Sequence, residues 1–540
     1  MTDDLNGCMP AIEKYIGLWM RAYNVPGLSV AITDKRRILS VSSYGFSNID
    51  SKRRVTGDTL FEIGSISKSF ACACLMQLAD EDRLDPSDPV EKHLPWLRLR
   101  FKDEPVTLHH LMSHTAGIIQ GTESALSGIP EVWTLKGLQP SVRPGTYYHY
   151  SNVGYKVLGL VLESLEGKSG AEVVKERVLD PLGMGSSHTT ITTDLRKLLA
   201  TGYEHTYDDR PVPLDAPVSP ATWIESETVD GSICSTPKDM ARYVRMLLNG
   251  GKASGGRVIS EKGYRLMTQR AIETEDGDGR SYYGYGLSTQ ELDGRTYLSH
   301  TGGMVGYHSS MMMDIEEGVG VFATINGPGA PSMVSAYILG TMRAQSGAGD
   351  VPMPVALPDP AKVPNAKDYS GTFGRKGRKL EFTSKGERLL LKIGHRSIAL
   401  EPREKDQFFV DHQGFDRFLV RFARKGGAVT GAFHGTEWFP GTSHTGPQEP
   451  KHPKGWEALA GHYRSYNPWD SNFRVLLRRG ELVFVHSSGV EEAMRPLSKG
   501  EFQVGDDTRS PERIRFDMVV DGKAHLAVYS GGTYYRTFTP

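Results

Sequence analysis

Ser65 and Lys68 stand three residues apart in the run Gly64-Ser65-Ile66-Ser67-Lys68-Ser69-Phe70. An apolar-rich stretch follows and predicts a helix that begins at Ser65, which places both side chains on one face. A helix N-terminus favours developing negative charge, and a lysine held against a serine hydroxyl can act as its base. The spacing therefore indicates nucleophilic chemistry at Ser65. The alternative is a capping serine with a solvated lysine, and Ser235-Thr236-Pro237-Lys238 shows that the spacing recurs.

Two further groups of residues could complete such a site. Tyr150-Ser151-Asn152 is the only Tyr-x-Asn in the chain and precedes an apolar helix predicted over 153–165. Its alternative interpretation is an aromatic strand end followed by an asparagine cap. His300-Thr301-Gly302-Gly303 ends the second arm of a hairpin predicted over 285–290 and 296–299, with a turn at Asp293-Gly294. A second His-Thr-Gly, at 444–446, lies between prolines without a strand beside it, so we discard it.

The surrounding pattern predicts how these groups are held. An amphipathic helix over 12–20 and strands over 28–32 and 38–42 precede Ser65, so its helix is expected to pack on a sheet already begun. Residues 86–270 are mostly helical, and strands return from Tyr282 before a closing helix over 331–343. His110 and His114 have the spacing of a helical metal pair, but no carboxylate accompanies them. We favour a structural helix end closed by Gly117 over a metal site.

The second part of the chain contains a repeat. Residues 346–366 are rich in Pro, Ala and Gly and predict a linker after a domain of residues 1–345. Tyr369-Ser370-Gly371-Thr372-Phe373 recurs as Leu459-Ala460-Gly461-His462-Tyr463, and Gly435-Thr436-Glu437-Trp438 recurs as Gly532-Thr533-Tyr534-Tyr535. Short alternating segments with polar turns suit small antiparallel barrels. We therefore predict a first, lipocalin-like barrel over 367–440, a linker over 441–455 and a second barrel over 456–540.

Composition limits the class of protein. A hydrophobic content of 38% and a charged content of 24% describe a globular protein with ample core, and 540 residues predict several domains. A net charge of −1 gives no electrostatic footprint for nucleic acid or an anionic membrane. The four cysteines form neither a disulfide framework nor a metal knuckle. With no visible signal peptide and no apolar run long enough to span a bilayer, a cytoplasmic location is expected.

The three motifs, in this order, resemble the signature of serine β-lactamases and penicillin-binding proteins. The phrases at 111–117, 144–155, 181–184 and 235–240 resemble the class C β-lactamase-like family, peptidase S12. This resemblance assigns Ser235 to a helix start away from the nucleophile. A catalytic domain followed by two related barrels is similar to the D-aminopeptidases of that family. The implied fold is multidomain: an α/β plus all-α β-lactamase/transpeptidase-like domain, with an antiparallel sheet flanked by helices, followed by two antiparallel β-barrels.

The resemblance also implies roles for the motif residues. Ser65 attacks a carbonyl and forms an acyl-enzyme, Lys68 and Tyr150 share the base role, and Asn152 orients Lys68 or the substrate amide. The N–H groups of Ser65 and Gly303 form the oxyanion hole, next to Gly302. His300 faces the same cavity and donates to Tyr150 or to the substrate. Position 300 is lysine in the β-lactamases, so a permanent cation for a β-lactam carboxylate is missing here. No metal or cofactor is expected.

The implied activity is release of N-terminal D-amino acids from peptides, amides or esters. In D-aminopeptidases a loop of the second barrel limits the amino end of the substrate, and the matching stretch is 504–511. Asp506 and Asp507 would then attract the substrate ammonium, whereas the alternative is a solvated turn. An esterase, a D-Ala-D-Ala carboxypeptidase and a non-catalytic ligand sensor that uses the barrels stay open. A small-molecule substrate, no nucleic acid and no membrane partner are expected, and a homodimer is among the assemblies left open.

Overall fold

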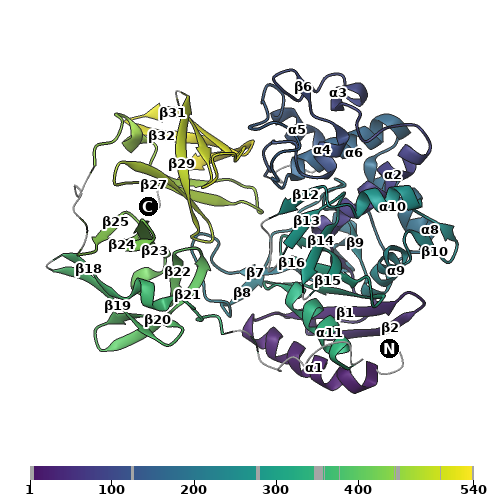
Figure 1. The fold of residues 1–540 in the computed structure, drawn as a ribbon, viewed down its shortest axis with the longest axis horizontal. Helices are drawn as coiled ribbons and strands as arrows, with labels where there is room; N and C mark the ends of the chain where they lie inside the picture. The colour runs from purple at the N-terminus through teal and green to yellow at the C-terminus, as the bar shows by residue number, and fades with distance from the viewer. Residues whose placement is uncertain are drawn as a thin grey trace. The chain divides into compact units, whose positions relative to one another are not determined.

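The computed structural model describes residues 5–122, 127–274, 280–292, 294–345, 357, 359–375, 377–442, 444, 450–498 and 500–537. The chain divides into two compact units (Figure 1). The first consists of Met1–Glu204 and Pro217–Ala356, and the second of His205–Ala216 and Leu357–Pro540. Half of the residues of the two predicted linkers, 346–356, 358, 443 and 445–449, lie outside the described residues, as does Asp293 of the predicted hairpin turn.

A nine-stranded antiparallel sheet forms the centre of the first unit. The alternation of apolar and polar residues in the strands is interrupted in β1 and β17, which are buried along their whole length. Both therefore lie inside the sheet, where β1 pairs with β17 although they are far apart in the chain. The strand order is β12 (Ile272–Thr274), β13 (Arg280–Tyr283), β14 (Ser288–Leu292), β15 (Arg295–Met304), β16 (Tyr307–Asp314), β17 (Val319–Ile325), β1 (Gly27–Asp34), β2 (Ile38–Asn48), β3 (Arg53–Arg54).

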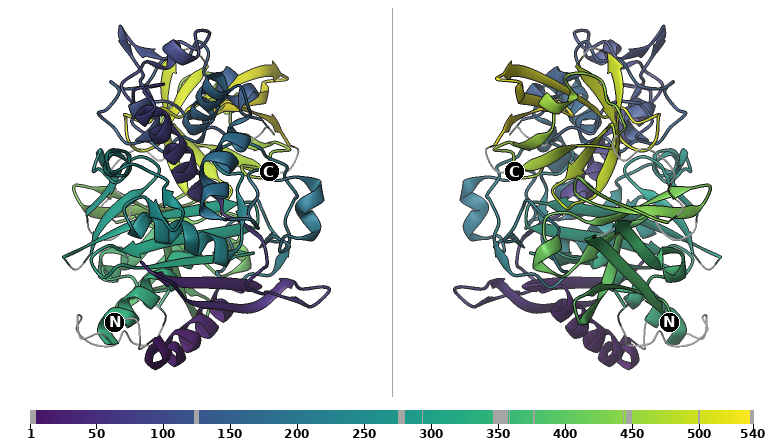
Figure 2. Two further views of the ribbon diagram at one scale, coloured as in Figure 1. Left: turned by 90° about the vertical axis from the view of Figure 1, so that its right-hand side faces the viewer. Right: turned by 90° about the vertical axis from the view of Figure 1, so that its left-hand side faces the viewer.

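Three helices pack on this sheet. The terminal helices α1 (Leu5–Ala22) and α11 (Pro331–Gln345) lie side by side (Figure 2), and the rings of Tyr15 and Tyr337 stack with centroids 3.8 Å apart. Helix α9 (Pro237–Leu248) packs against β1 and β17. Thr236 caps its N-terminus by accepting a hydrogen bond from the amide of Asp239, and Pro237 occupies the first turn, where it costs no hydrogen bond.

The remaining helices form a largely helical region that carries two of the motifs. Helix α2 (Ser67–Asp80) is apolar on nearly every side because it is buried on every side. Helix α6 (Asn152–Glu166) begins at a Ser151 cap and ends at Gly167, which has a positive φ of 68°. The others are α3 (Val90–His93), α4 (Leu108–Met112), α5 (Gly128–Thr134), α7 (Gly170–Val174), α8 (Asp180–Leu182) and α10 (Glu261–Met267).

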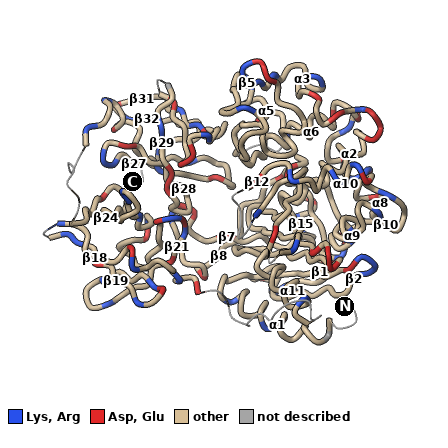
Figure 3. The backbone as a smooth tube through the Cα atoms, viewed as in Figure 1, with Lys and Arg blue, Asp and Glu red and all other residues tan. Residues whose placement is uncertain are grey.

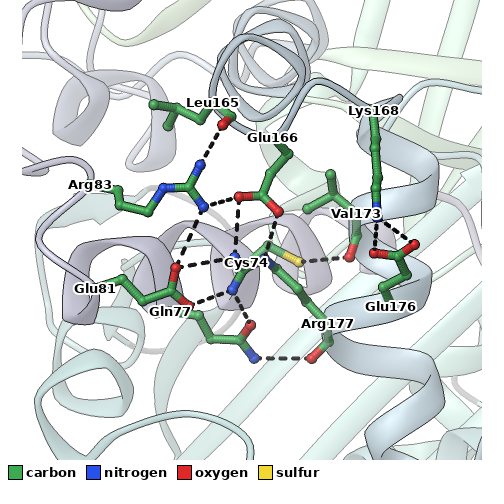
Figure 4. A network of polar contacts seen from close by, with 10 residues as sticks. All are labelled: Cys74, Gln77, Glu81, Arg83, Leu165, Glu166, Lys168, Val173, Glu176 and Arg177. Atoms are coloured by element: carbon green, nitrogen blue, oxygen red, sulfur yellow. Dashed lines mark hydrogen bonds and ion pairs between the residues drawn. The ribbon is translucent and has the colours of Figure 1, made fainter.

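An ion-pair network ties the far end of α2 to the far end of α6 (Figure 4). Arg177 contacts Glu81 at 2.7 Å and Glu166 at 3.2 Å, and Arg83 also contacts Glu166. Gln77 of α2 donates to the carbonyl of Arg177 at 3.0 Å. Arg177 and Glu166 are partly buried, so their pair is screened less than an exposed one, whereas Glu81 and Arg83 are exposed. The network fixes the spacing of the two helices whose opposite ends carry Lys68 and Asn152.

The second unit is all-β. Strands β18–β25 form an eight-stranded sheet whose end strands contact each other, and β26–β33 form a closed barrel. The repeated Gly371 and Gly461 begin the first strand of each, as the repeat predicts. The first sheet comprises β18 (Gly371–Arg375), β19 (Arg378–Lys385), β20 (Arg388–Ile393), β21 (Arg396–Glu404), β22 (Gln407–Val410), β23 (Val420–Lys425), β24 (Ala428–His434) and β25 (Glu437–Pro440). The barrel comprises β26 (Gly461–Arg464), β27 (Asn472–Arg478), β28 (Glu481–His486), β29 (Glu491–Ser498), β30 (Glu501–Val504), β31 (Arg513–Val520), β32 (Lys523–Tyr529) and β33 (Gly532–Arg536). The predicted fold class, a sheet-and-helix domain followed by two barrel-like domains, is confirmed.

One segment of the second unit comes from the middle of the first. His205–Ala216 leaves between β7 (Tyr203–His205) and β8 (Val218–Pro220) and packs with the β-sheets of the second unit. Asp209 forms an ion pair with the nearly buried Arg474 of β27 at 3.2 Å, and Arg210 pairs with Asp416 at 3.1 Å. The sequence pattern gives no sign of this excursion, because its polar residues are typical of any exposed loop.

Charges are distributed without a dominant sign. Figure 3 shows Lys and Arg interspersed with Asp and Glu over both units, in agreement with the net charge of −1. Within the described part of the chain, no helix has the length and apolar character that crossing a membrane requires.

Candidate active site

Ser65 lies on a short 3-10 turn, η2 (Gly64–Ile66), which leads directly into α2. The predicted α-helix therefore begins two residues later than Ser65. Gly64 has a φ of 54°, a conformation that suits glycine, and a Cβ there would lie 2.5 Å from the carbonyl oxygen of Gly303. The preceding strand β4 (Phe61–Glu62) pairs with β9 (Cys234–Ser235), which fastens the turn to the protein interior.

Lys68 is the most informative side chain of the site. It is fully buried, and its Nζ donates hydrogen bonds to Ser65 Oγ at 2.9 Å and to the carbonyl of Asp230 at 2.9 Å. The same Nζ lies 4.9 Å from the centroid of the Tyr150 ring. No carboxylate among the described residues forms an ion pair with it. A lysine so placed can exchange a proton with the serine hydroxyl.

Gly302 and Gly303 bring strand β15 against the serine turn. A Cβ on Gly302 would lie 1.8 Å from the carbonyl oxygen of Ile63 and 3.2 Å from the amide nitrogen of Ser65. Only glycine permits this approach. The backbone of β15 is therefore beside the amide of Ser65, the arrangement that a two-amide oxyanion hole requires.

Tyr150 and Asn152 flank the start of α6. Ser151 caps the helix by accepting from the amide of Gly154 at 3.1 Å, so Asn152 occupies the first helical position. The Oδ1 of Asn152 is buried and has no hydrogen-bond partner among the described residues. Tyr150 lies with its ring toward Lys68. An unsatisfied buried amide oxygen two residues after Tyr150 is a candidate acceptor for a substrate N–H.

His300 is buried and bonded at both ring nitrogens. Its Nδ1 lies 2.6 Å from the carbonyl of Thr301, so Nδ1 carries the proton, and Nε2 accepts from the hydroxyl of Tyr283 at 2.9 Å. Burial, with a smaller contribution from Lys68, lowers the pKa of His300 to about 4, so the ring is neutral near pH 7. Both bonds go to protein groups, which differs from the expected donation to Tyr150 or to the substrate.

The site also contains His114, which the sequence pattern predicts only as part of a structural helix end. Its Nδ1 accepts from the amide of Ser151 at 3.0 Å, and its ring lies over that of Tyr150 with centroids 4.2 Å apart. Burial, Lys68 and His300 hold the pKa of His114 well below its usual range. Nε2–H is thus buried, with no hydrogen-bond partner among the described residues. The spacing to His110 is that of a helical metal pair, but a structural helix end is the favoured prediction, and His110 closes a capping box with Thr107.

Glu62 lies three residues before the serine, and the sequence pattern does not predict it as a residue of the site. It is almost completely buried, and burial raises the pKa of its carboxyl to about 8. With Tyr307 and Trp223 it lines a small cavity of about 20 Å³. A single glutamate in an apolar strand gives no sequence signal, because its burial depends on β9 and β16, which come later in the chain.

The repeated Ser-x-x-Lys lies in a different environment. Ser235 pairs with Phe61 in the β4–β9 ladder, and Lys238 forms an exposed ion pair with Asp58 at 2.7 Å. The pair therefore serves structural roles, as the resemblance implies. Of the second His-Thr-Gly, only His444 lies among the described residues. The residues that the structure describes include no group of three or more His, Cys, Asp and Glu side chains arranged to hold a metal ion.

Asp506 and Asp507 lie in a turn after β30 whose polar groups are bonded locally. Asp507 pairs with Arg509 at 2.6 Å, which lowers the pKa of its carboxyl, and Asp506 accepts from the amide of Ala493 at 3.1 Å. Arg495 donates to the carbonyls of Gly505 and Asp506. That the turn limits the substrate's amino end stays a prediction.

A known protein family matches the part of the chain that contains the sheet, the serine turn and β15. The family model described as "Beta-lactamase" matches residues 12–340, more than half of the chain. The chain belongs to the beta-lactamase family. This fold family, which includes the penicillin-binding proteins, consists of serine hydrolases, and the match covers Ser65, Lys68, Tyr150, Asn152 and His300.

Individual relatives are distant. The chain is similar to Protein flp of Staphylococcus aureus (strain N315), with 25% identity over 255 residues, 45% of this chain and 50% of that protein. It is also similar to Protein Rv1367c of Mycobacterium tuberculosis, with 29% identity over 283 residues, 46% of this chain and 69% of that protein. The chain thus spans about half the length of the first of these relatives.

Among solved structures, an octameric penicillin-binding protein homologue from Pyrococcus abyssi is 25% identical. It aligns over 80% of this chain and 99% of that chain with a TM-score of 0.57. A penicillin-binding protein from Bacillus halodurans shares the fold, with 22% identity, a TM-score of 0.51 and coverage of 60% of this chain and 98% of that chain.

Proposed function

We propose that the chain is a serine hydrolase that acts through an acyl-enzyme formed on Ser65. The observation that carries the proposal is the 2.9 Å contact between Lys68 Nζ and Ser65 Oγ, made by a lysine with no carboxylate partner among the described residues. A serine hydroxyl is a weak nucleophile until an adjacent base accepts its proton. Lys68 is within reach of that proton, and Tyr150 lies next to Lys68.

The reaction then follows from the positions of these groups. Ser65 Oγ forms a bond to the substrate carbonyl carbon while its proton passes to the Lys68–Tyr150 pair. The carbonyl oxygen becomes negative opposite the amides of Ser65 and Gly303. The pair returns the proton to the leaving amine or alcohol as the scissile bond breaks. The same pair then deprotonates a water molecule, which attacks the ester carbonyl and releases the acyl group from Ser65. The proton returns to Ser65 Oγ, which restores the enzyme.

The substrate that we propose is a peptide, amide or ester with a free N-terminal D-amino acid. The two barrels after the hydrolase unit support this choice, as does the replacement of a lysine by His300, whose neutral ring supplies no charge for a substrate carboxylate. The neutral ring disfavours β-lactam and D-Ala-D-Ala carboxypeptidase substrates, which present a carboxylate. We further propose that Asp506 and Asp507 bind the substrate ammonium.

A substrate panel tests this proposal. D- and L-amino-acid p-nitroanilides, short-chain p-nitrophenyl esters and a chromogenic cephalosporin are compared on the full chain. Faster hydrolysis of the D-anilides supports the aminopeptidase, and turnover of esters alone indicates an esterase. Turnover of none of them contradicts the hydrolase and favours a ligand sensor.

Replacement of residues 505–510 by a short Gly-Ser turn tests the substrate-limiting loop. We expect lower activity on free-amine substrates and better acceptance of N-acetyl substrates, by roughly ten- to a hundredfold in their ratio, because a charge-assisted contact is lost. An unchanged ratio would show that the loop is only a turn.

A further inference from the structure

A cavity in the second unit lies among residues that the hydrolase chemistry does not use. Its volume is about 680 Å³, within the range of small-molecule sites. It is formed where β25, the start of β19 and the β27–β28 turn come together. The charged side chains that line it are Arg375, Arg378, Lys451, Arg478, Arg479 and Glu437.

The charges around this cavity are unbalanced. Among the described residues that line it, Glu437 is the only carboxylate, and Arg378 pairs with it. Arg478 is neutralised by the buried Glu491. Arg375 and Lys451 have no ion-pair or hydrogen-bond partner among the described residues. The cavity therefore has an excess of positive charge, whereas the chain as a whole has a net charge of −1.

An aromatic wall adjoins these cations. The ring of Trp438 lines the cavity, and the guanidinium of Arg479 lies 4.8 Å from its centroid. Phe433 packs against the same ring with centroids 4.4 Å apart. A Cβ on Gly431 would fall 2.0 Å from the indole, so this glycine makes room for the ring. The indole is thus held in one place before any ligand arrives, which lowers the entropic cost of binding.

Arg479 occupies an unusual position for a charged residue. It has a φ of 51° and is followed by Gly480, with a φ of 83°, in the turn between β27 and β28. Asn, Asp or Gly is normally found at the first position of such a turn, because other residues are strained there. A strained arginine that lines a cavity and lies over a tryptophan suggests a binding role rather than a turn-forming one.

We propose that this cavity binds a small organic anion that has an apolar or aromatic body and a carboxylate or sulfonate group. The body would stack on Trp438 beside Leu477, and the anionic group would be bound by Arg479, Arg375 and Lys451. Guanidinium groups bind such oxyanions in a bidentate manner. The proposal is independent of the hydrolase reaction, since none of these residues belongs to the serine site.

The test uses the full chain and the anionic dye 1-anilinonaphthalene-8-sulfonate, with dye fluorescence and calorimetry as readouts. We expect one saturable site whose affinity falls as salt is raised. Arg479→Ala and Lys451→Glu should each weaken binding at least about tenfold, and Trp438→Leu should also weaken it. The matched control is Arg396→Glu, which removes an exposed arginine of the same sheet outside the cavity and should leave binding unchanged.

Three outcomes would overturn the proposal. The first is the absence of a saturable site on the wild-type chain. The second is equal binding by Lys451→Glu and wild type, since Lys451 is exposed and its replacement does not threaten folding. The third is competition by inorganic phosphate as strong as that by a naphthalene sulfonate, which would show that the apolar wall contributes nothing.

Discussion

The imidazole of His114 lies over the ring of Tyr150 with centroids 4.2 Å apart, while its Nδ1 accepts a hydrogen bond from the backbone amide of Ser151. One histidine therefore holds both the phenol ring and the peptide that leads to Asn152. Its φ of 55° is tolerated by asparagine, which permits a substitution that leaves the backbone conformation in place.

We predict that His114→Asn lowers kcat about 10- to 100-fold with a small change in KM, because a misplaced Tyr150 harms proton transfer more than binding. The control is His110→Asn, whose imidazole bonds Thr107 in the same helix. The rate of Ser65 labelling by a fluorophosphonate should fall in parallel with kcat. Equal loss of kcat in both variants would assign His114 a purely structural role.

Lys68 and Tyr150 are predicted to act as one proton-transfer unit, since Nζ lies 4.9 Å from the centroid of the phenol ring. Lys68→Ala and Tyr150→Phe should each cost several orders of magnitude in kcat, and the double variant little more. The measurement is a double-mutant cycle with the fastest substrate of the panel. Fully additive losses would contradict a shared role.

His300 should make the folded state sensitive to acid. Its pKa of about 4 lies below the ordinary value of 6.5, so the unfolded chain binds more protons between these values. The free energy of unfolding should therefore fall as the pH drops from 6.5 toward 4, by at most about 1.4 kcal/mol per pH unit from this group. In His300→Gln, urea unfolding should show a shallower pH dependence. An unchanged slope would mean that His300 is already titrating like an exposed histidine.

The buried carboxyl of Glu62 should make the free energy of unfolding fall as the pH rises. Its pKa of about 8 in the folded state exceeds the ordinary value of 4.5, so the folded chain binds more protons between these values. The stabilisation is complete below pH 4.5 and is lost as the pH rises through 8. Glu62→Gln removes the titration, and the stability of the variant relative to wild type should increase from pH 5 to pH 8.5. A constant difference would show that Glu62 is ionised throughout.

The sequence predicted those parts of the site that lie within short segments. Ser65 and Lys68 share one turn, and His300-Thr301-Gly302 lies in a strand that alternation reveals, although β15 continues to Met304, beyond the predicted end. The repeat likewise predicted two barrels, because each copy carries its own turn glycines.

Features that depend on distant contacts were not predicted. His114 enters the site only because His149 and Ser151 return to it, and the two bonds of His300 require Tyr283 from a neighbouring strand. The path of His205–Ala216 among the β-sheets of the second unit is fixed by arginines more than 200 residues later, such as Arg474. Local pattern carries no information about such partners.

The most direct test of the account is intact-mass spectrometry of the chain after treatment with a fluorophosphonate, with peptide mapping of the adduct. We predict a single adduct on Ser65, its loss together with all turnover in Ser65→Ala, and unchanged labelling in Ser235→Ala. An adduct on Ser235, or a Ser65→Ala protein that still hydrolyses substrate, would contradict the assignment of Ser65 as the nucleophile.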